Sequence, residues 1–187
     1  INKHIMPVYN KPMIYYSLSV LMLCKFKEVI LICDPNSKEI FKKMFSNGKY
    51  LGMKIIILIQ KNPNGIPEAF LVAKKYIKNQ NVCLILGDNF FYGQGFYESL
   101  KKGINLKKGA FFLAYNVQQP ENYAVINQKK NKIIDIEEKP KNPKSNLVIP
   151  GLYFFDKNVV RYCKHLIKSN RNELEIVDLL KIYVENN

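Results

Sequence analysis

The sequence has very little arginine. Only Arg161 and Arg171 stand among 29 basic residues, which face 15 acidic residues and give a formal net charge of +14. Proteins that recognise a base sequence depend on the forked guanidinium group, so a surplus made almost entirely of lysine argues against a nucleic-acid partner. The lysines are spread along the chain, which is typical of a solvated basic surface that can also attract anionic ligands.

The sequence also lacks paired cysteines and long apolar runs. Its cysteines stand singly, with no C-x-x-C spacing that would hold a metal or a redox pair, at Cys24, Cys33, Cys83 and Cys163. We expect them to be small apolar residues in a reducing compartment. No segment reaches the roughly 18 apolar residues of a membrane span, and no signal peptide opens the sequence, which predicts a cytoplasmic protein with no membrane partner. His4 and His165 are isolated and are expected at the surface or at a cap.

Helical and strand patterns alternate over most of the chain. The 187 residues are 48% apolar, which is enough for one hydrophobic core, and no repeat or low-complexity linker divides them. Helices are expected over 12–23, 37–45, 67–77 and 96–102, and strands over 28–33, 54–59, the run ending before Asp88, and 110–115. The alternation predicts an α/β fold with a Rossmann-like, mostly parallel mixed sheet and helices on both faces.

The pattern changes after residue 116. Two short β-type runs, 123–127 and 132–137, are separated by a polar turn and predict a hairpin. A long strand is expected over 147–155, and a last helix over 173–184. This part of the chain is therefore expected to add antiparallel strands to the parallel ones.

A carboxylate follows the apolar run 82–86. The order Gly87-Asp88-Asn89 places it at the carboxyl end of a predicted central strand, where ligands bind in open α/β sheets. An aspartate in this place can hold a divalent cation against a substrate phosphate. The alternative interpretation is an Asx-turn that closes the strand. A second polar cluster, at 136–140, favours the functional interpretation.

Several motifs occur together in one order and spacing. They are residues 3–23, Leu-Gly-Asp-Asn-Phe-Phe-Tyr-Gly at 86–93, Ile-Glu-Glu-Lys-Pro at 136–140, 143–146, 150–156, and Glu-Leu-Glu-Ile at 173–176. With them the whole chain resembles glucose-1-phosphate thymidylyltransferases, and Lys-Pro-Met-Ile-Tyr-Tyr at 11–16 favours this branch over uridylyl and adenylyl relatives. The resemblance implies a nucleotidyltransferase catalytic domain over 1–187. It also implies Mg²⁺ as cofactor, dTTP and glucose 1-phosphate as partners, a homo-oligomer, and dTDP-glucose for dTDP-rhamnose and polysaccharide synthesis.

The resemblance also implies a role for individual residues. Asp88 would bind Mg²⁺, Lys139 the phosphate of the sugar phosphate, and Lys3 the charge on the transferring phosphate, so these three are the expected catalytic residues and should face one cleft. Gln60 would contact the thymine edge, and Glu138 the glucose hydroxyls. Further substrate contacts are implied for Gly65, Gly87, Asn89, Tyr123, Ala124 and Ile149. Taken singly, each of these residues is interpreted as an ordinary surface or turn residue.

Some features of the family are not found in this sequence. They are the first strand with its Gly-rich phosphate loop, and a Leu-Asp-Thr-Gly segment that carries a second metal-binding aspartate. Ala124 stands where the family usually has glycine, so a methyl group would crowd the sugar pocket. We therefore expect an incomplete catalytic domain, weakly active or inactive by itself. The alternative is a non-catalytic α/β module that binds a sugar phosphate or a nucleotide sugar, and a nucleic-acid binder is a distant third.

Overall fold

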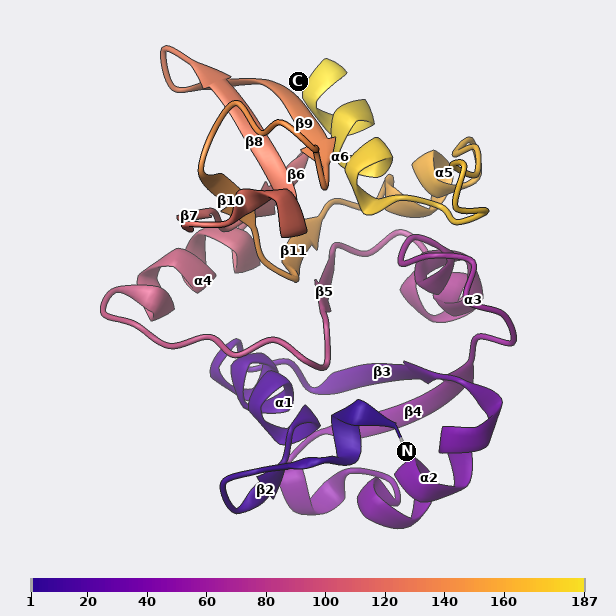
Figure 1. Ribbon diagram of the computed structural model, residues 1–187. Coiled ribbons are helices and arrows are strands. Elements are labelled where there is room, and N and C mark those ends of the chain that lie inside the picture. Colours follow the sequence, from indigo (N-terminus) through magenta and orange to yellow (C-terminus); the bar gives the residue numbers. More distant parts are fainter. Residues whose placement is uncertain (1, 187) are drawn as a thin grey trace.

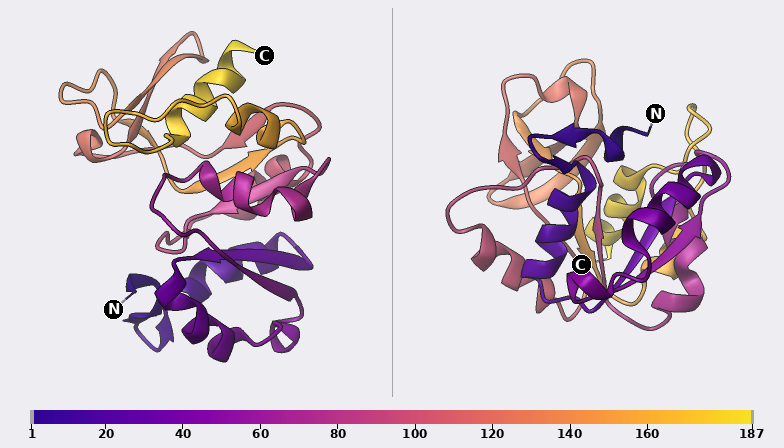
Figure 2. Two further views of the ribbon diagram at one scale, coloured as in Figure 1. Left: turned by 90° about the vertical axis from the view of Figure 1, so that its right-hand side faces the viewer. Right: turned by 90° about the horizontal axis from the view of Figure 1, so that it is seen from below.

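The computed structural model describes residues 2–186, and the order of its elements follows the predicted alternation (Figures 1 and 2). The α-helices are α1 (Ile14–Leu23), α2 (Lys38–Phe45), α3 (Glu68–Ile77), α4 (Phe96–Ile104), α5 (Val159–Cys163) and α6 (Ile176–Glu185). Short 3-10 turns are η1 (Lys3–Ile5), η2 (Pro35–Ser37), η3 (Lys49–Leu51) and η4 (Pro120–Asn122). Within residues 2–186, none of the helices has the length and apolar character needed to cross a membrane.

The described strands are arranged in four sheets. The strands are β1 (Pro7–Val8), β2 (Lys11–Pro12), β3 (Glu28–Cys33), β4 (Lys54–Ile59), β5 (Val82–Ile85), β6 (Ala110–Phe112), β7 (Tyr115–Asn116), β8 (Ala124–Lys129), β9 (Lys132–Glu138), β10 (Leu147–Ile149) and β11 (Leu152–Phe155). Strands β3 and β4 pair in parallel, and β11 lies antiparallel between β5 and β6. The antiparallel sheet β7-β10-β8-β9 contains the predicted hairpin. The mixed α/β class is confirmed, with less parallel pairing than the alternation suggested, because β11 separates β5 from β6.

The predicted strand 147–155 is divided at Pro150 and Gly151. Strand β10 belongs to the antiparallel sheet and β11 to the sheet of β5 and β6, so the chain changes sheet at this junction. Gly151 donates its N–H to Asn89 Oδ1 at 3.0 Å, and its carbonyl accepts from the N–H of Leu86 at 2.8 Å. A Cβ at Gly151 would lie 2.6 Å from the Leu86 side chain. The junction is therefore held against the end of β5.

Three hydrophobic clusters join these elements. Phe41 and Phe45 of α2 pack with Val29 and Leu31 of β3 in the first cluster. A second cluster surrounds Phe155 and includes α3, α6 and the hairpin, and a third joins α1 and α4 to β11. Figure 1 shows β5 between the β3–β4 pair and the later strands. The four cysteines are free, and three of them are buried, in agreement with a role in the core.

Candidate functional site

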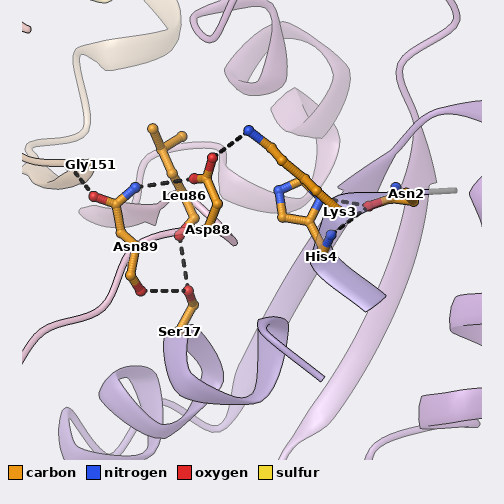
Figure 3. A network of polar contacts seen from close by, with 8 residues as sticks. All are labelled: Asn2, Lys3, His4, Ser17, Leu86, Asp88, Asn89 and Gly151. Carbon is orange, nitrogen blue, oxygen red and sulfur yellow. Dashed lines mark hydrogen bonds and ion pairs between the residues drawn. The ribbon is translucent and has the colours of Figure 1, made fainter. Parts of the chain in front are cut away.

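Lys3 and Asp88 are in direct contact at the carboxyl end of β5 (Figure 3). Lys3 Nζ lies 2.5 Å from Asp88 Oδ2, and the two side chains are 62% and 30% exposed. Burial by itself would raise the pKa of Asp88, but the hydrogen bond and charge of Lys3, with a hydrogen bond from Asn89, hold that pKa below its ordinary value. Asp88 is therefore ionised at neutral pH and accessible to a cation.

Asn89 holds the Asp88 loop in place. Its Nδ2 donates to Asp88 Oδ1 at 3.1 Å, and its Oδ1 accepts the Gly151 N–H. From α1, Ser17 Oγ donates to the carbonyls of Leu86 at 2.9 Å and of Asn89 at 3.3 Å. Figure 3 shows this chain of contacts from α1 to the β10–β11 junction. Asn89 was predicted to contact substrate, and in this structure its side chain positions Asp88.

His4, which was expected at the surface or at a cap, is partly buried and lies beside the Asp88 loop. Its Nδ1 is 2.8 Å from Asn2 Oδ1, and its ring covers Gly87, where a Cβ would come within 2.8 Å of the imidazole. Burial lowers the pKa of His4, although the negative charge of Asp88 opposes this effect. A neutral imidazole thus occupies the space that glycine leaves at position 87.

A second group of predicted residues gathers on the antiparallel sheet, and we call it the Glu138 cluster: Tyr123, Ala124, Glu138, Lys139 and Ile149. Ala124 of β8 is paired in register with Glu138 of β9 and with Ile149 of β10. Lys139 follows β9 directly and donates its N–H to the Tyr123 carbonyl at 3.0 Å. Its φ of +43° is in the left-handed region, which costs an L-residue roughly 1–2 kcal/mol. Such backbone strain is common at functional positions.

Arg171 belongs beside the Glu138 cluster, although the sequence analysis gave it no role. Its Nη2 lies 3.4 Å from Glu138 Oε1 and 2.6 Å from Glu175 Oε2, while its Nε donates to Glu175 Oε1 at 3.1 Å. Ser169 Oγ also donates to Glu175, at 2.6 Å. Burial raises the pKa of Glu138, and the charge of Arg171 opposes this shift. The available signal was its rarity: Arg171 is one of two arginines and lies two residues before the motif at 173–176.

Gln60 and Gly65 are parts of one closed loop after β4. Gln60 continues the parallel ladder by donating its N–H to the Cys33 carbonyl at 2.9 Å, and its Nε2 donates to the Gly65 carbonyl at 3.1 Å. Gly65 has φ +98°, and a Cβ there would lie 2.0 Å from the Leu174 carbonyl oxygen. Only glycine fits this approach. The loop therefore packs against the segment that carries Arg171.

The three expected catalytic residues are distributed over two groups. Lys3 and Asp88 form one pair, and Lys139 lies in the Glu138 cluster. The β10–β11 junction connects the groups, because Gly151 binds Asn89 while β10 pairs with β8. Both groups therefore adjoin the β10–β11 junction. Together they contain the cations and acids expected for binding phosphates and a sugar.

Comparisons with known proteins show the family to which the chain belongs. The family model for nucleotidyl transferases matches residues 1–187. Glucose-1-phosphate thymidylyltransferases from Neisseria meningitidis and Neisseria gonorrhoeae are 43% and 42% identical to this chain over 187 residues, which is all of it. The chain spans 65% of the length of each of these two relatives.

A solved structure supports the same relationship. It is a Bacillus anthracis protein assigned as a glucose-1-phosphate thymidylyltransferase, in complex with sucrose. It superposes with a TM-score of 0.91 at 33% identity, covering 100% of this chain and 75% of that one. The chain therefore belongs to the nucleotidyl transferase family, in which it is similar to glucose-1-phosphate thymidylyltransferases.

Proposed function

We propose that this chain binds dTTP and glucose 1-phosphate for thymidylyl transfer, with dTDP-glucose and pyrophosphate as products. The observation that carries the proposal is the Lys3–Asp88 pair, a cation and an ionised carboxylate at the carboxyl end of β5. It is found in a chain that matches curated thymidylyltransferases over its full length. A phosphate oxygen of glucose 1-phosphate would attack the α-phosphorus of dTTP, and the bond to the leaving pyrophosphate would break.

Asp88 fits a magnesium ion that is held jointly with a substrate phosphate. Within residues 2–186, no group of three acidic, histidine or cysteine side chains could hold a metal without other ligands. Mg²⁺ is commonly bound by one or two carboxylates together with water and substrate phosphates, which one accessible aspartate satisfies. When bound, the ion would neutralise phosphate charge. Lys3 pairs with Asp88 and can exchange this carboxylate for a phosphate oxygen.

The Glu138 cluster provides groups for the sugar phosphate. Glu138 can accept hydrogen bonds from glucose hydroxyls, since carboxylate oxygens have free lone pairs beyond the single contact to Arg171. Arg171 contacts this carboxylate and Lys139 follows it in the chain, and both can pair with the phosphate. Glu175 contacts both Nε and Nη2 of Arg171, which fixes the plane of the guanidinium group. Positioning of two polyanions is the main contribution that such a reaction needs.

Gln60 is the residue that we assign to recognition of the base. Its Nε2 is held by the Gly65 carbonyl, which fixes the orientation of the amide and leaves Oε1 as an acceptor. The N3–H of thymine is a donor that matches this acceptor. On the family resemblance, we also propose that the protein is a cytoplasmic homo-oligomer in the synthesis of dTDP-rhamnose for polysaccharide.

Ligand binding to the 187-residue chain tests this proposal. In isothermal titration calorimetry, we expect dTDP-glucose to bind more tightly than dTDP, and glucose 1-phosphate more tightly than glucose 6-phosphate. Arg171→Gln should weaken dTDP-glucose binding by about tenfold or more, since hydrogen bonds to charged groups contribute roughly 1.5–3 kcal/mol. The control Glu121→Gln changes an exposed acid and should leave both affinities unchanged. Equal affinities for dTDP-glucose and dTDP would contradict the sugar pocket. If glucose 1-phosphate binds but neither dTDP nor dTDP-glucose does, the result would favour the non-catalytic module.

A further inference from the structure

A hollow of about 210 Å³ lies between α3 and the segment that contains α5, on a part of the surface for which the proposed reaction has no use. Figure 1 shows α3 and α5 as neighbours. We call this the basic hollow, and its lining residues are Lys74, Lys78, Asn79, Lys157, Val160, Arg161 and Lys164. Five of them are cations, and none is an acid.

The end of α3 and the region of α5 bring these cations together. Lys74 and Lys78 are four residues apart at the end of α3, and Lys157 and Arg161 are four apart at α5. Lys78 caps the C-terminus of α3 and Lys157 precedes α5, so each pair has one member on a helix and one beside its end, and their like charges repel one another. Because α3 and α5 pack together, these like charges face a single hollow. Binding of an anion would remove this repulsion.

Some lysines elsewhere in the protein have acidic partners. Lys54 lies 2.8 Å from Glu28, and Lys101 lies 2.9 Å from Glu98. Among residues 2–186, by contrast, no ion pair joins any cation of the basic hollow to a carboxylate. Arg161 instead donates from Nη2 to the hydroxyl of Tyr162 at 3.4 Å, with the guanidinium carbon 5.0 Å from the centre of that ring. The charge of the hollow is therefore concentrated and uncompensated.

We propose that the basic hollow binds a small polyphosphate anion, of the size of pyrophosphate or of a nucleotide's phosphate chain. Ammonium and guanidinium groups are the usual ligands of phosphate, and Asn79 adds an amide donor at the rim. The hollow's limited volume and its two-sided lining favour a compact anion over an extended polymer. It is also separate from the candidate site: the Gly65 loop precedes α3, whereas the hollow lies at the other end of this 10-residue helix, about 15 Å away.

Amide NMR spectra of the ¹⁵N-labelled chain, titrated with pyrophosphate at low salt and without Mg²⁺, test this inference. We expect saturable shifts at Lys78, Asn79 and Val160. Shifts at Gly87 and Gly151, which report on the candidate site, are recorded separately. The variant Lys74→Gln/Lys78→Gln/Arg161→Gln should weaken this binding by at least about tenfold, or roughly 1.4 kcal/mol. The charge-matched control, with the exposed residues changed as Lys107→Gln/Lys108→Gln/Lys129→Gln, should change it less than about twofold. Because all of these side chains are exposed, the fold should be retained, and the single variant Lys78→Gln repeats the test if it is not.

Several outcomes would overturn the inference. Absence of shifts at the hollow would do so, and an equal loss in both triple variants would show that only diffuse charge attracts the anion. A titration with dTDP distinguishes the two sources of the phosphates: added shifts from the nucleoside would identify a nucleotide, and equal shifts would identify the bare diphosphate. Tighter binding of a single-stranded oligonucleotide, or of anionic lipid vesicles, through the same amides would assign the surface to a macromolecule instead. If amide shifts appear at the hollow but not at Gly87 and Gly151, the result would count against the proposed function and leave this inference intact.

Discussion

Replacing Lys139 with glycine should make the protein more stable and its sugar-phosphate binding weaker. Lys139 has φ +43° and precedes Pro140, and both features are unfavourable for a residue with a Cβ. Glycine removes a penalty of about 1–2 kcal/mol but loses roughly 0.5–1 kcal/mol through the greater entropy of the unfolded chain. The N–H that binds the Tyr123 carbonyl is retained. The free energy of unfolding should therefore rise by about 0.5–1 kcal/mol.

The same change removes the ammonium group that we assign to the phosphate of glucose 1-phosphate. A hydrogen bond to a charged group contributes roughly 1.5–3 kcal/mol, so the affinity for glucose 1-phosphate should fall by about tenfold to a hundredfold. Scanning calorimetry should show the melting temperature rising by about 2–4 °C for each kcal/mol gained. Isothermal titration calorimetry should show the loss of affinity in the same preparation.

Lys130 provides a matched control in the hairpin. It too is a lysine in the left-handed region, with φ +49°, and it lies in the turn between β8 and β9. Lys130→Gly should give a similar gain in melting temperature without any change in affinity. If Lys139→Gly binds glucose 1-phosphate as tightly as the parent chain, the phosphate role of Lys139 is wrong. If it lowers the melting temperature while Lys130→Gly raises it, the strain argument is wrong.

Three more substitutions address the two residue groups. Lys3→Ala should lower the free energy of unfolding by less than about 1 kcal/mol, because the pair with Asp88 is partly exposed. The pKa of Asp88 is lowered from 3.8, so denaturation at several pH values should show the full difference above pH 3.8 and its loss as the pH falls through the lowered pKa. Asn89→Ala leaves the part-buried Gly151 N–H unpaired and should lower the free energy of unfolding by about 1–3 kcal/mol, and slow amide exchange at Gly151 in the variant would refute this. Arg171→Gln removes the charge that opposes burial of Glu138, so NMR titration should find a higher pKa for Glu138, whereas an unchanged pKa would contradict the contact.

The sequence predicts best those elements whose pattern is local. The strands expected over 28–33 and 54–59 are found at these bounds as β3 and β4, since uninterrupted β-branched runs are bordered by turn residues. The division of 147–155 was missed although Pro150-Gly151 is a local turn signal. The contact that holds this junction, to the Asn89 side chain, is distant in the sequence. The position of β11 between β5 and β6 is likewise a long-range pairing that no local pattern encodes.

The candidate site was predicted mainly through the family resemblance. Asp88 was also indicated by its position after a buried run, and the structure places it at the end of β5 next to Lys3, 85 positions earlier in the sequence. Arg171 was missed because its contact with Glu138 joins separate segments of the chain, although its contact with Glu175 is local. His4 was missed for a similar reason, since the glycine that accommodates its ring is at position 87.

Magnesium-dependent pyrophosphate release from dTTP and glucose 1-phosphate is the most direct test of the central claim. It should be measured on this chain joined to the parts of the Neisseria meningitidis relative that it does not match, in the parent form and with Asp88→Asn. We predict a rate at least about a hundredfold lower for Asp88→Asn, with an unchanged fold, because a neutral amide cannot hold the cation against the phosphates. Asp135→Asn, which changes a similarly exposed aspartate paired with Lys181, should keep the parent rate. A parental rate in Asp88→Asn at limiting Mg²⁺ would contradict the account.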